Sequence, residues 1–178
     1  VQGYWQWDWA DSIRALGAVT NTTNTTGGGG VDVAFAAAGG GAVKAGARWV
    51  GLNLLGELDA PGEYYVSART GLLHYLPRTP PAAWAEDPVV SVHARAVDLR
   101  GVAHVTLEGL AIAHATSTGV DATGNGGGVV VRNCTVFGHG AHGITLTGGA
   151  RSGVEGSVVH DVGCRGMTVH GGNQTTLE

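Results

Sequence analysis

The 178-residue chain is long enough for one domain, or for one domain with an extension, and 43% apolar residues suffice for a sizeable core. Its formal charge of -4 and its single lysine, Lys44, offer no basic cluster, so we expect no nucleic-acid partner. No apolar run approaches the ~18 residues of a membrane-spanning helix, so we also expect no membrane span.

An aromatic segment opens the chain over residues 1–19. It holds four aromatic residues within six positions: Tyr4, Trp5, Trp7 and Trp9. Alternation of the three tryptophans predicts a strand that packs one face against the end of the following fold. The alternative is an exposed cluster that stacks on sugar rings, with Asp8 and Asp11 as hydrogen-bonding groups. We favour the strand.

Residues 20–46 form a low-complexity insertion of Thr, Asn, Gly and Ala. We expect it to be mobile or loosely packed, with one strand at 31–35. Its two Asn-x-Thr sequons, at Asn21 and Asn24, predict glycosylation and a secreted or cell-surface protein. Further sequons begin at Asn133 and Asn173. Asn133 falls at a bend between strands, where we expect an inward side chain that hydrogen-bonds backbone groups.

A lead-in segment spans residues 47–88. Its strand-like runs 63–66 and 72–76 flank a five-residue loop ending in Gly71, which predicts a β-hairpin. Residues 53–59 just upstream read as a short helix or turn. The acidic side chains around this turn are expected to be solvated or to cap it: Glu57, Asp59 and Glu63.

Residues 89–178 are organised as a repeat of about two dozen residues. Its copies are AVDLRG (96–101), GVDATG (119–124), GITLTG (143–148) and GMTVHG (166–171), with starts 23, 24 and 23 residues apart. A second shared pattern recurs at 105–112, 129–136 and 152–159. Short, β-branched runs interrupted by glycine at this period indicate a coiled stack of strands. The sequence thus predicts an all-β chain, a right-handed parallel β-helix (solenoid) with an N-terminal β-hairpin and aromatic extension.

The repeat also predicts which residues are buried, because each coil covers the apolar face of the next. The four columns are Val97, Val120, Ile144 and Met167; Leu99, Ala122, Leu146 and Val169; Leu107, Val131 and Val154; and Ile112, Val136 and Val159. Cys134 shares an inward column with Leu110 and Ser157, which predicts a small buried residue. With Cys164 it offers at most one disulfide. Because Glu178 falls where another coil is due, we expect a truncated C-terminus and edge contacts with missing coils or another chain.

Two stretches resemble a known family: NLLGELDAPGEYYVSARTGLLHYLP (53–77) and VVHDVGCRGMTVHGGNQTTL (158–177). They are similar to the lead-in hairpin and the coils of secreted right-handed parallel β-helix proteins of the pectin-lyase-like superfamily. The resemblance covers roughly 47–177 and implies the fold. It further implies action on polysaccharides or glycosides, as lyases or hydrolases, for members with assigned activities. The chain departs from the pattern at Asn173, where an acidic residue commonly follows the two glycines.

The best candidate site lies on two outward ladders of the stack. One is Asp98, Asp121, Thr145 and Thr168, and the next is Arg100, Thr123, Thr147 and His170. Neighbouring carboxylates raise one another's pKa, so one of Asp98 and Asp121 would be protonated and the other ionised, as a glycoside hydrolase needs. A lyase would need a base and a cation for the uronate, roles that Arg100 or His170 can take.

We therefore assign catalytic roles to Asp98, Asp121 and His170. Substrate-binding roles fall to Arg100, Thr145, Thr168, His142, Asp161 and Arg165. His139, His142 and Asp161 are also conceivable metal ligands, but a His-x-x-His in a glycine-rich turn is a weak signal. We expect no metal site and no cofactor beyond a loosely bound cation.

The functional prediction is an extracellular carbohydrate-active protein that cleaves or binds a polysaccharide or glycan along the outward face of the coils. The alternative is a non-catalytic structural or glycan-binding module of a cell-wall or surface assembly. The sequence does not decide whether the chain is an enzyme. If it is one, a glycoside hydrolase or a polysaccharide lyase is expected.

Overall fold

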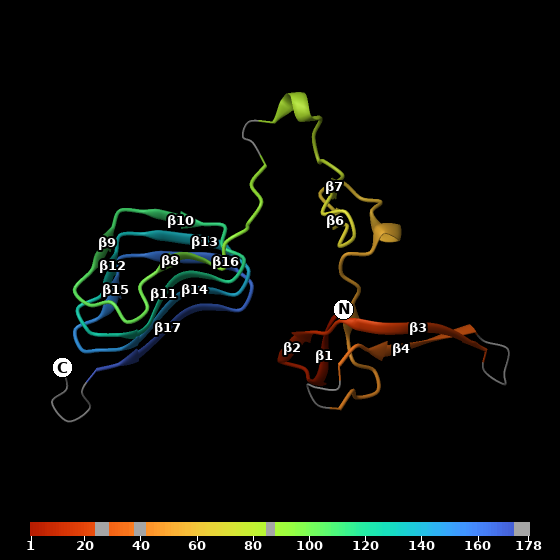
Figure 1. Cartoon of the computed structure of the whole chain (residues 1–178), viewed down its shortest axis with the longest axis horizontal. Coiled ribbons are helices and arrows are strands. Elements are labelled where there is room, and N and C mark those ends of the chain that lie inside the picture. Colours follow the sequence, from red (N-terminus) through yellow and green to blue (C-terminus); the bar gives the residue numbers. More distant parts are fainter. Residues whose placement is uncertain (24–28, 38–41, 85–87, 173–178) are drawn as a thin grey trace. The chain divides into compact units, whose positions relative to one another are not determined.

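The computed structural model describes residues 1–23, 29–37, 42–84 and 88–172 (Figure 1). The chain divides into two compact units, Val1–Ala85 and Glu86–Glu178. Within the described residues secondary structure consists of strands and two short 3-10 helices, so the prediction of an all-β chain is confirmed. No helix among these residues is long and apolar enough to cross a membrane. The sequons at Asn24 and Asn173 lie outside the described residues.

The aromatic segment forms a small antiparallel sheet. Strand β1 (Gln2–Trp7) pairs with β2 (Ala10–Ile13) on one side and with β5 (Trp49–Val50) on the other. Trp5 is buried, donates its indole N–H to the Ser12 carbonyl and meets the Phe35 ring edge-on. Trp7 pairs with Ala10, so the chain turns back directly after Trp7. The prediction that the three tryptophans share one strand face is therefore wrong.

A second hairpin follows, from β3 (Leu16–Thr23) and β4 (Gly29–Phe35). The strand expected at 31–35 is present, but β3 was not expected beyond residue 20. Threonine is β-branched and favours strands, and this preference outweighs the loop-like composition. Asn21 lies exposed in β3 opposite Val31.

The lead-in contains the predicted hairpin, as β6 (Tyr64–Val66) and β7 (Leu73–Tyr75). Gly71 in its loop has a φ of 70°, a conformation that favours glycine. The expected short helix is the 3-10 helix η1 (Leu55–Glu57), and a second, η2, spans Pro81–Ala83. The Glu63 carboxylate accepts hydrogen bonds from the backbone N–H groups of Asp59 and Ala60, which confirms its capping role.

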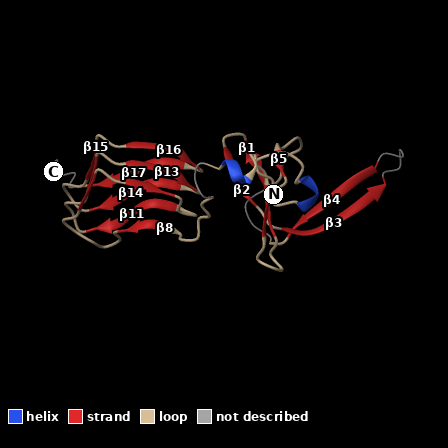
Figure 2. Cartoon of the chain, turned by 90° about the horizontal axis from the view of Figure 1, so that it is seen from above, coloured by secondary structure: helices blue, strands red, loops and turns tan. Residues whose placement is uncertain are grey.

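Three parallel sheets build the second unit (Figures 1 and 2). The first holds β8 (Arg95–Asp98), β11 (Thr118–Asn125), β14 (His142–Gly148) and β17 (Arg165–Gly171). The second holds β9 (Thr106–Glu108), β12 (Val130–Arg132) and β15 (Gly153–Glu155), and the third holds β10 (Ala111–Ala113), β13 (Thr135–His139) and β16 (Val158–Val162). Successive strands pass from sheet to sheet, so every three strands complete one coil. The predicted parallel β-helix is confirmed.

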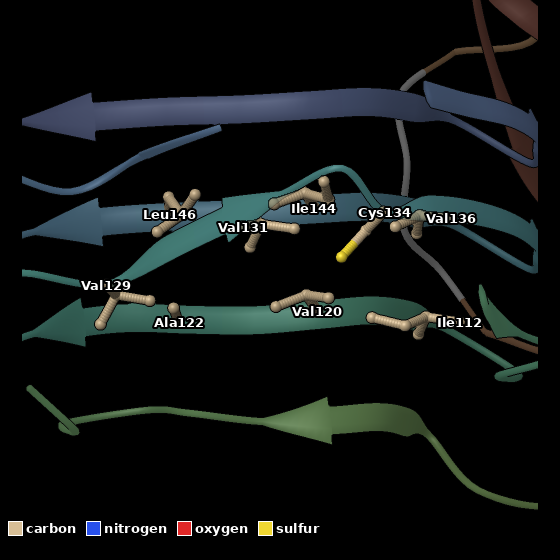
Figure 3. Packing of buried hydrophobic residues seen from close by; sticks show 9 residues of the cluster. All are labelled: Ile112, Val120, Ala122, Val129, Val131, Cys134, Val136, Ile144 and Leu146. Carbon is tan, nitrogen blue, oxygen red and sulfur yellow. The ribbon is translucent and has the colours of Figure 1, made fainter. Parts of the chain in front are cut away.

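The strand register matches the predicted columns. Val120 pairs with Val97 and Ile144, Val131 with Leu107 and Val154, and Val136 with Ile112 and Val159. The middle coils enclose a core of nine buried residues: Ile112, Val120, Ala122, Val129, Val131, Cys134, Val136, Ile144 and Leu146 (Figure 3). Cys134 is 2% exposed, as predicted, and both it and the exposed Cys164 are free thiols.

The bend between β12 and β13 departs from expectation. Asn133 has a φ of 49°, and this left-handed turn leaves its side chain exposed. The predicted inward side chain of Asn133 is therefore wrong.

Candidate functional site

The outward surface of the sheet β8–β11–β14–β17, here called the ladder face, carries the predicted site residues. Asp98, Asp121, Thr145 and Thr168 pair in succession, and Thr147 pairs with His170. Because adjacent strands lie about 4.8 Å apart, these side chains repeat at that interval. The register of the predicted ladder is confirmed.

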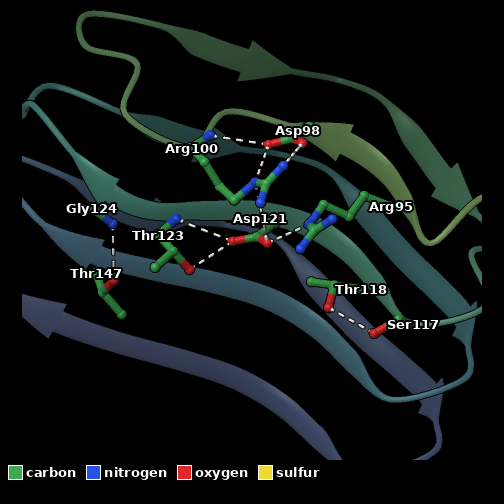
Figure 4. Close-up of polar contacts among 9 residues, drawn as sticks. All are labelled: Arg95, Asp98, Arg100, Ser117, Thr118, Asp121, Thr123, Gly124 and Thr147. Carbon is green, nitrogen blue, oxygen red and sulfur yellow. Dashed lines mark hydrogen bonds and ion pairs between the residues drawn. The ribbon is translucent and has the colours of Figure 1, made fainter.

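Asp121 is the most buried member of this ladder, and Figure 4 shows its polar contacts. Its carboxylate accepts hydrogen bonds from Arg95 Nε (2.5 Å), Thr123 Oγ1 (2.7 Å) and the Thr123 backbone N–H (3.1 Å). These neighbours leave Asp121 only 7% exposed. We expected an exposed carboxylate here, and this expectation is wrong because Arg95 covers the group.

Asp98 lies on the neighbouring strand β8, and its carboxylate is bound by Arg100, two residues further along the chain. The guanidinium donates from Nε (2.8 Å) and from Nη2 (2.7 Å) to different oxygens of the carboxylate, and the Arg100 backbone N–H adds a contact of 3.2 Å. The Nε atom of Arg100 also lies 4.0 Å from an oxygen of Asp121. The two carboxylates are thus interleaved with two guanidinium groups (Figure 4).

This arrangement keeps both carboxyl groups ionised. Hydrogen bonds from the side chain and backbone of Arg100 lower the pKa of Asp98 to about 2. Burial raises the pKa of Asp121, but the hydrogen bonds from Thr123 and Arg95 together outweigh it, and the net pKa is lowered. The prediction that one of this pair has a raised pKa is wrong, because each carboxylate faces an arginine more closely than it faces the other.

The same ion pair affects Arg100. The hydrogen bond to Asp98 raises the pKa of its guanidinium, so Arg100 is held in its charged form and is a poor general base. His170 lies exposed at the end of β17 opposite Thr147. The catalytic roles of Asp98, Asp121 and His170 stay predictions.

The conceivable metal ligands are not brought together. His139 is 3% exposed, and its Nδ1 accepts the Ala115 backbone N–H while Nε2 lies 3.1 Å from the Ile112 carbonyl oxygen. A carbonyl only accepts, so Nε2 carries the proton and both ring nitrogens are occupied. The Asp161 carboxylate pairs with His160 instead. The described residues include no group of three or more His, Cys, Asp or Glu side chains that could hold a metal ion.

Two predicted substrate-binding residues, His142 and Arg165, pair at the start of β14 and β17, two residues before the inward positions Ile144 and Met167. His142 is half-buried, and its Nδ1 has no hydrogen-bond partner among the residues that the structure describes. Asp161 lies at the end of β16, in a different sheet. The sheet β8–β11–β14–β17 therefore carries Thr145, Thr168, His142 and Arg165, Arg100 follows its first strand, and Asp161 lies in another sheet.

Sequence reasoning missed Arg95, which neutralises Asp121. Arg95 stands two residues before the buried Val97, a spacing that predicts an inward side chain. It lies instead at the beginning of β8, where its long side chain reaches along the sheet to the next coil (Figure 4). The sequence contains one signal for this contact, since a charged residue, Arg95, directly precedes the first copy of the repeat.

A second exposed group lies in the first unit. Trp7 and Trp9 are 54% and 81% exposed, and their rings lie 6.4 Å apart at an interplanar angle of 24°. Asp8 between them pairs with Lys44 at 2.5 Å. Two exposed aromatic rings are therefore available for the alternative hypothesis that this cluster stacks on sugar rings.

Comparison with known proteins gives one match. The family model described as the right-handed β-helix region matches residues 89–178, which is half of the chain. The chain has no significant match among curated proteins or among solved structures. The matched range contains the strands of the three-sheet solenoid, and the chain belongs to the right-handed β-helix family.

Proposed function

We propose that this chain is an extracellular glycan-binding module that holds a polysaccharide along the ladder face without cleaving it. One observation carries the proposal: Asp98 and Asp121 are both ionised and bound by arginines, on a sheet whose other rungs carry threonine hydroxyls. Membership of the right-handed β-helix family is compatible with a carbohydrate ligand. Binding requires neither a metal nor another cofactor in this proposal.

The spacing of the ladder suits a polymeric ligand. Thr145 and Thr168 are half-buried on adjacent strands, so their hydroxyls are fixed on the sheet at about 4.8 Å intervals. A threonine hydroxyl both donates and accepts, as sugar hydroxyls do, and so pairs with them in either sense. A polysaccharide offers such groups repeatedly along its length.

Cleavage is disfavoured by the ionisation of the pair. A glycoside hydrolase needs one carboxylic acid with a raised pKa that protonates the leaving oxygen. Both groups here have lowered pKa values. A lyase would need a free base. Arg100 is held charged by Asp98, which leaves His170, exposed on β17, as the remaining base candidate named from the sequence.

The test is binding of the chain to a panel of soluble polysaccharides by isothermal titration calorimetry. Thr145→Val and Thr168→Val keep the side-chain shape and remove the hydroxyl, and each is expected to weaken binding about fivefold, the value of one hydrogen bond. Thr135→Val is the matched control, because Thr135 is exposed on β13 in another sheet. Binding should persist in the presence of a chelator.

Two results would contradict the proposal. One is the absence of binding to every polysaccharide. The other is release of reducing or unsaturated sugar ends by the native chain, lost in Asp98→Asn or Asp121→Asn, which would make the pair catalytic.

A further inference from the structure

The charges of the ladder face point to the class of polysaccharide. Within residues 88–172, five arginines stand against five carboxylates, with no lysine. On the ladder face, two of those arginines are already matched: Arg95 with Asp121 and Arg100 with Asp98. From this balance we infer that the ladder face takes a neutral polysaccharide and rejects a polyuronate. The inference rests on the proposed function and names its ligand class.

The decisive contact is the pair of Arg100 and Asp98. Two nitrogens of the Arg100 guanidinium already donate hydrogen bonds to the two carboxylate oxygens of Asp98. The pair of donors that could bind a uronate carboxylate is therefore already engaged by Asp98. Both side chains are about half exposed, at 51% and 43%. A uronate approaching Arg100 therefore meets the negative charge of Asp98 and has to displace it.

The rest of the ladder offers little positive charge. Arg165 is exposed at the start of β17, and no ion pair forms at it within the described part of the chain. A polyuronate carries a carboxylate on every sugar and needs a cation at each coil. The next two residues of the ladder after Asp121 are Thr145 and Thr168, whose side chains can hydrogen-bond sugar hydroxyl groups but carry no positive charge.

The inference predicts a gain of binding in one variant. Asp98→Asn leaves the shape of residue 98 unchanged and removes the negative charge that holds both donor nitrogens of Arg100, whose remaining carboxylate neighbour is Asp121 at 4.0 Å. The variant is expected to gain about tenfold in affinity for a polyuronate, the value of one charge-assisted contact. Glu155→Gln is the matched control, because it frees Arg132 in the sheet β9–β12–β15.

The experiment compares neutral glucan, galactan, xylan and mannan with polygalacturonate and alginate, by calorimetry on the full chain. The native chain should bind a neutral polymer with an affinity that changes little between about 50 and 500 mM NaCl. The affinity gained by Asp98→Asn should disappear at the higher salt. Far-ultraviolet circular dichroism shows that the variant is folded.

Three outcomes would overturn the inference. Preferential, salt-sensitive binding of a polyuronate by the native chain would contradict it while leaving the proposed function intact. The same holds if Asp98→Asn gains no more than Glu155→Gln. Absence of binding to both classes would overturn the proposed function and this inference with it.

Discussion

His139 illustrates how one side chain closes a corner of the solenoid. Its imidazole joins the Ala115 N–H to the Ile112 carbonyl, two backbone groups of the preceding coil. Gly119 lies against the ring, and a Cβ there would come within 2.5 Å of Nε2. His139 thus accepts a hydrogen bond from one buried backbone N–H group and donates one to a carbonyl of the neighbouring strand. Its role is structural, because backbone groups engage both of its ring nitrogens.

The buried imidazole makes stability depend on pH. Burial lowers the pKa of His139, and the nearby His114 lowers it further, against the hydrogen bond to Ile112. Above the unfolded pKa of about 6.5 both states are neutral, so His139 contributes no pH dependence there. Below about pH 6.5 the imidazole is protonated in the unfolded chain but stays neutral in the folded chain. The free energy of unfolding therefore falls as the pH is lowered, by up to about 1.4 kcal/mol per pH unit, until the pH reaches the pKa of His139 in the folded chain.

Replacement of His139 should remove this slope. His139→Gln is expected to cost about 1–3 kcal/mol at pH 7.5, because a buried backbone group loses its partner. The variant should also lose stability less steeply than the native chain as pH falls below about 6.5. Urea unfolding at a series of pH values measures both effects, with the exposed His170→Gln as control. An unchanged slope in His139→Gln would show that its titration is not linked to folding.

At the scale of elements, the β1–β2 hairpin divides its tryptophans between two roles. Trp5 fills the inner face, between the Phe35 ring and the guanidinium of Arg14, which lies 5.3 Å from the Trp5 ring. Trp9 lies in the turn and is 81% exposed. The alternating pattern alone could not distinguish Trp5 from Trp9, because it assumes that the strand continues past Trp7. Asp8 favours turns, and the strand ends before it.

This division predicts unequal effects of truncation. Trp5→Ala should destabilise the sheet β1–β2–β5 by about 3–5 kcal/mol, since it empties the centre of the unit. Trp9→Ala should change stability by less than about 0.5 kcal/mol. Amide hydrogen exchange of the β1 and β5 backbone, followed by mass spectrometry, measures the local stability. Similar losses in the two variants would mean that Trp9 also packs against the fold.

At the scale of the solenoid, periodicity was sufficient to predict the register. Each coil must bury its apolar side chains against the next, so Val120 and Ile144 could be aligned without a structure. The electrostatics of the ladder were not predictable in the same way. They depend on where the long side chains of Arg95 and Arg100 end, several bonds from the backbone that the repeat determines. The period of the repeat determines where each Cβ atom lies. The pKa of Asp98 depends instead on the position of the guanidinium group of Arg100.

The stack also predicts that stability depends on the position of a coil. Ile144 lies between two neighbouring coils and is fully buried, whereas Met167, one strand further along the same column, is 51% exposed. Ile144→Ala should lower the free energy of unfolding of the solenoid by about 2–5 kcal/mol through the cavity it leaves. Met167→Ala should cost less than about 1.5 kcal/mol, because half of its surface already meets solvent.

Urea unfolding followed by far-ultraviolet circular dichroism compares the two variants with the native chain. Equal losses would mean that Met167 is covered in solution as Ile144 is, by a further coil or by another chain docked on β17. In that case the loss in Met167→Ala would grow with protein concentration if the cover is a second copy, and would not change if it belongs to the same chain.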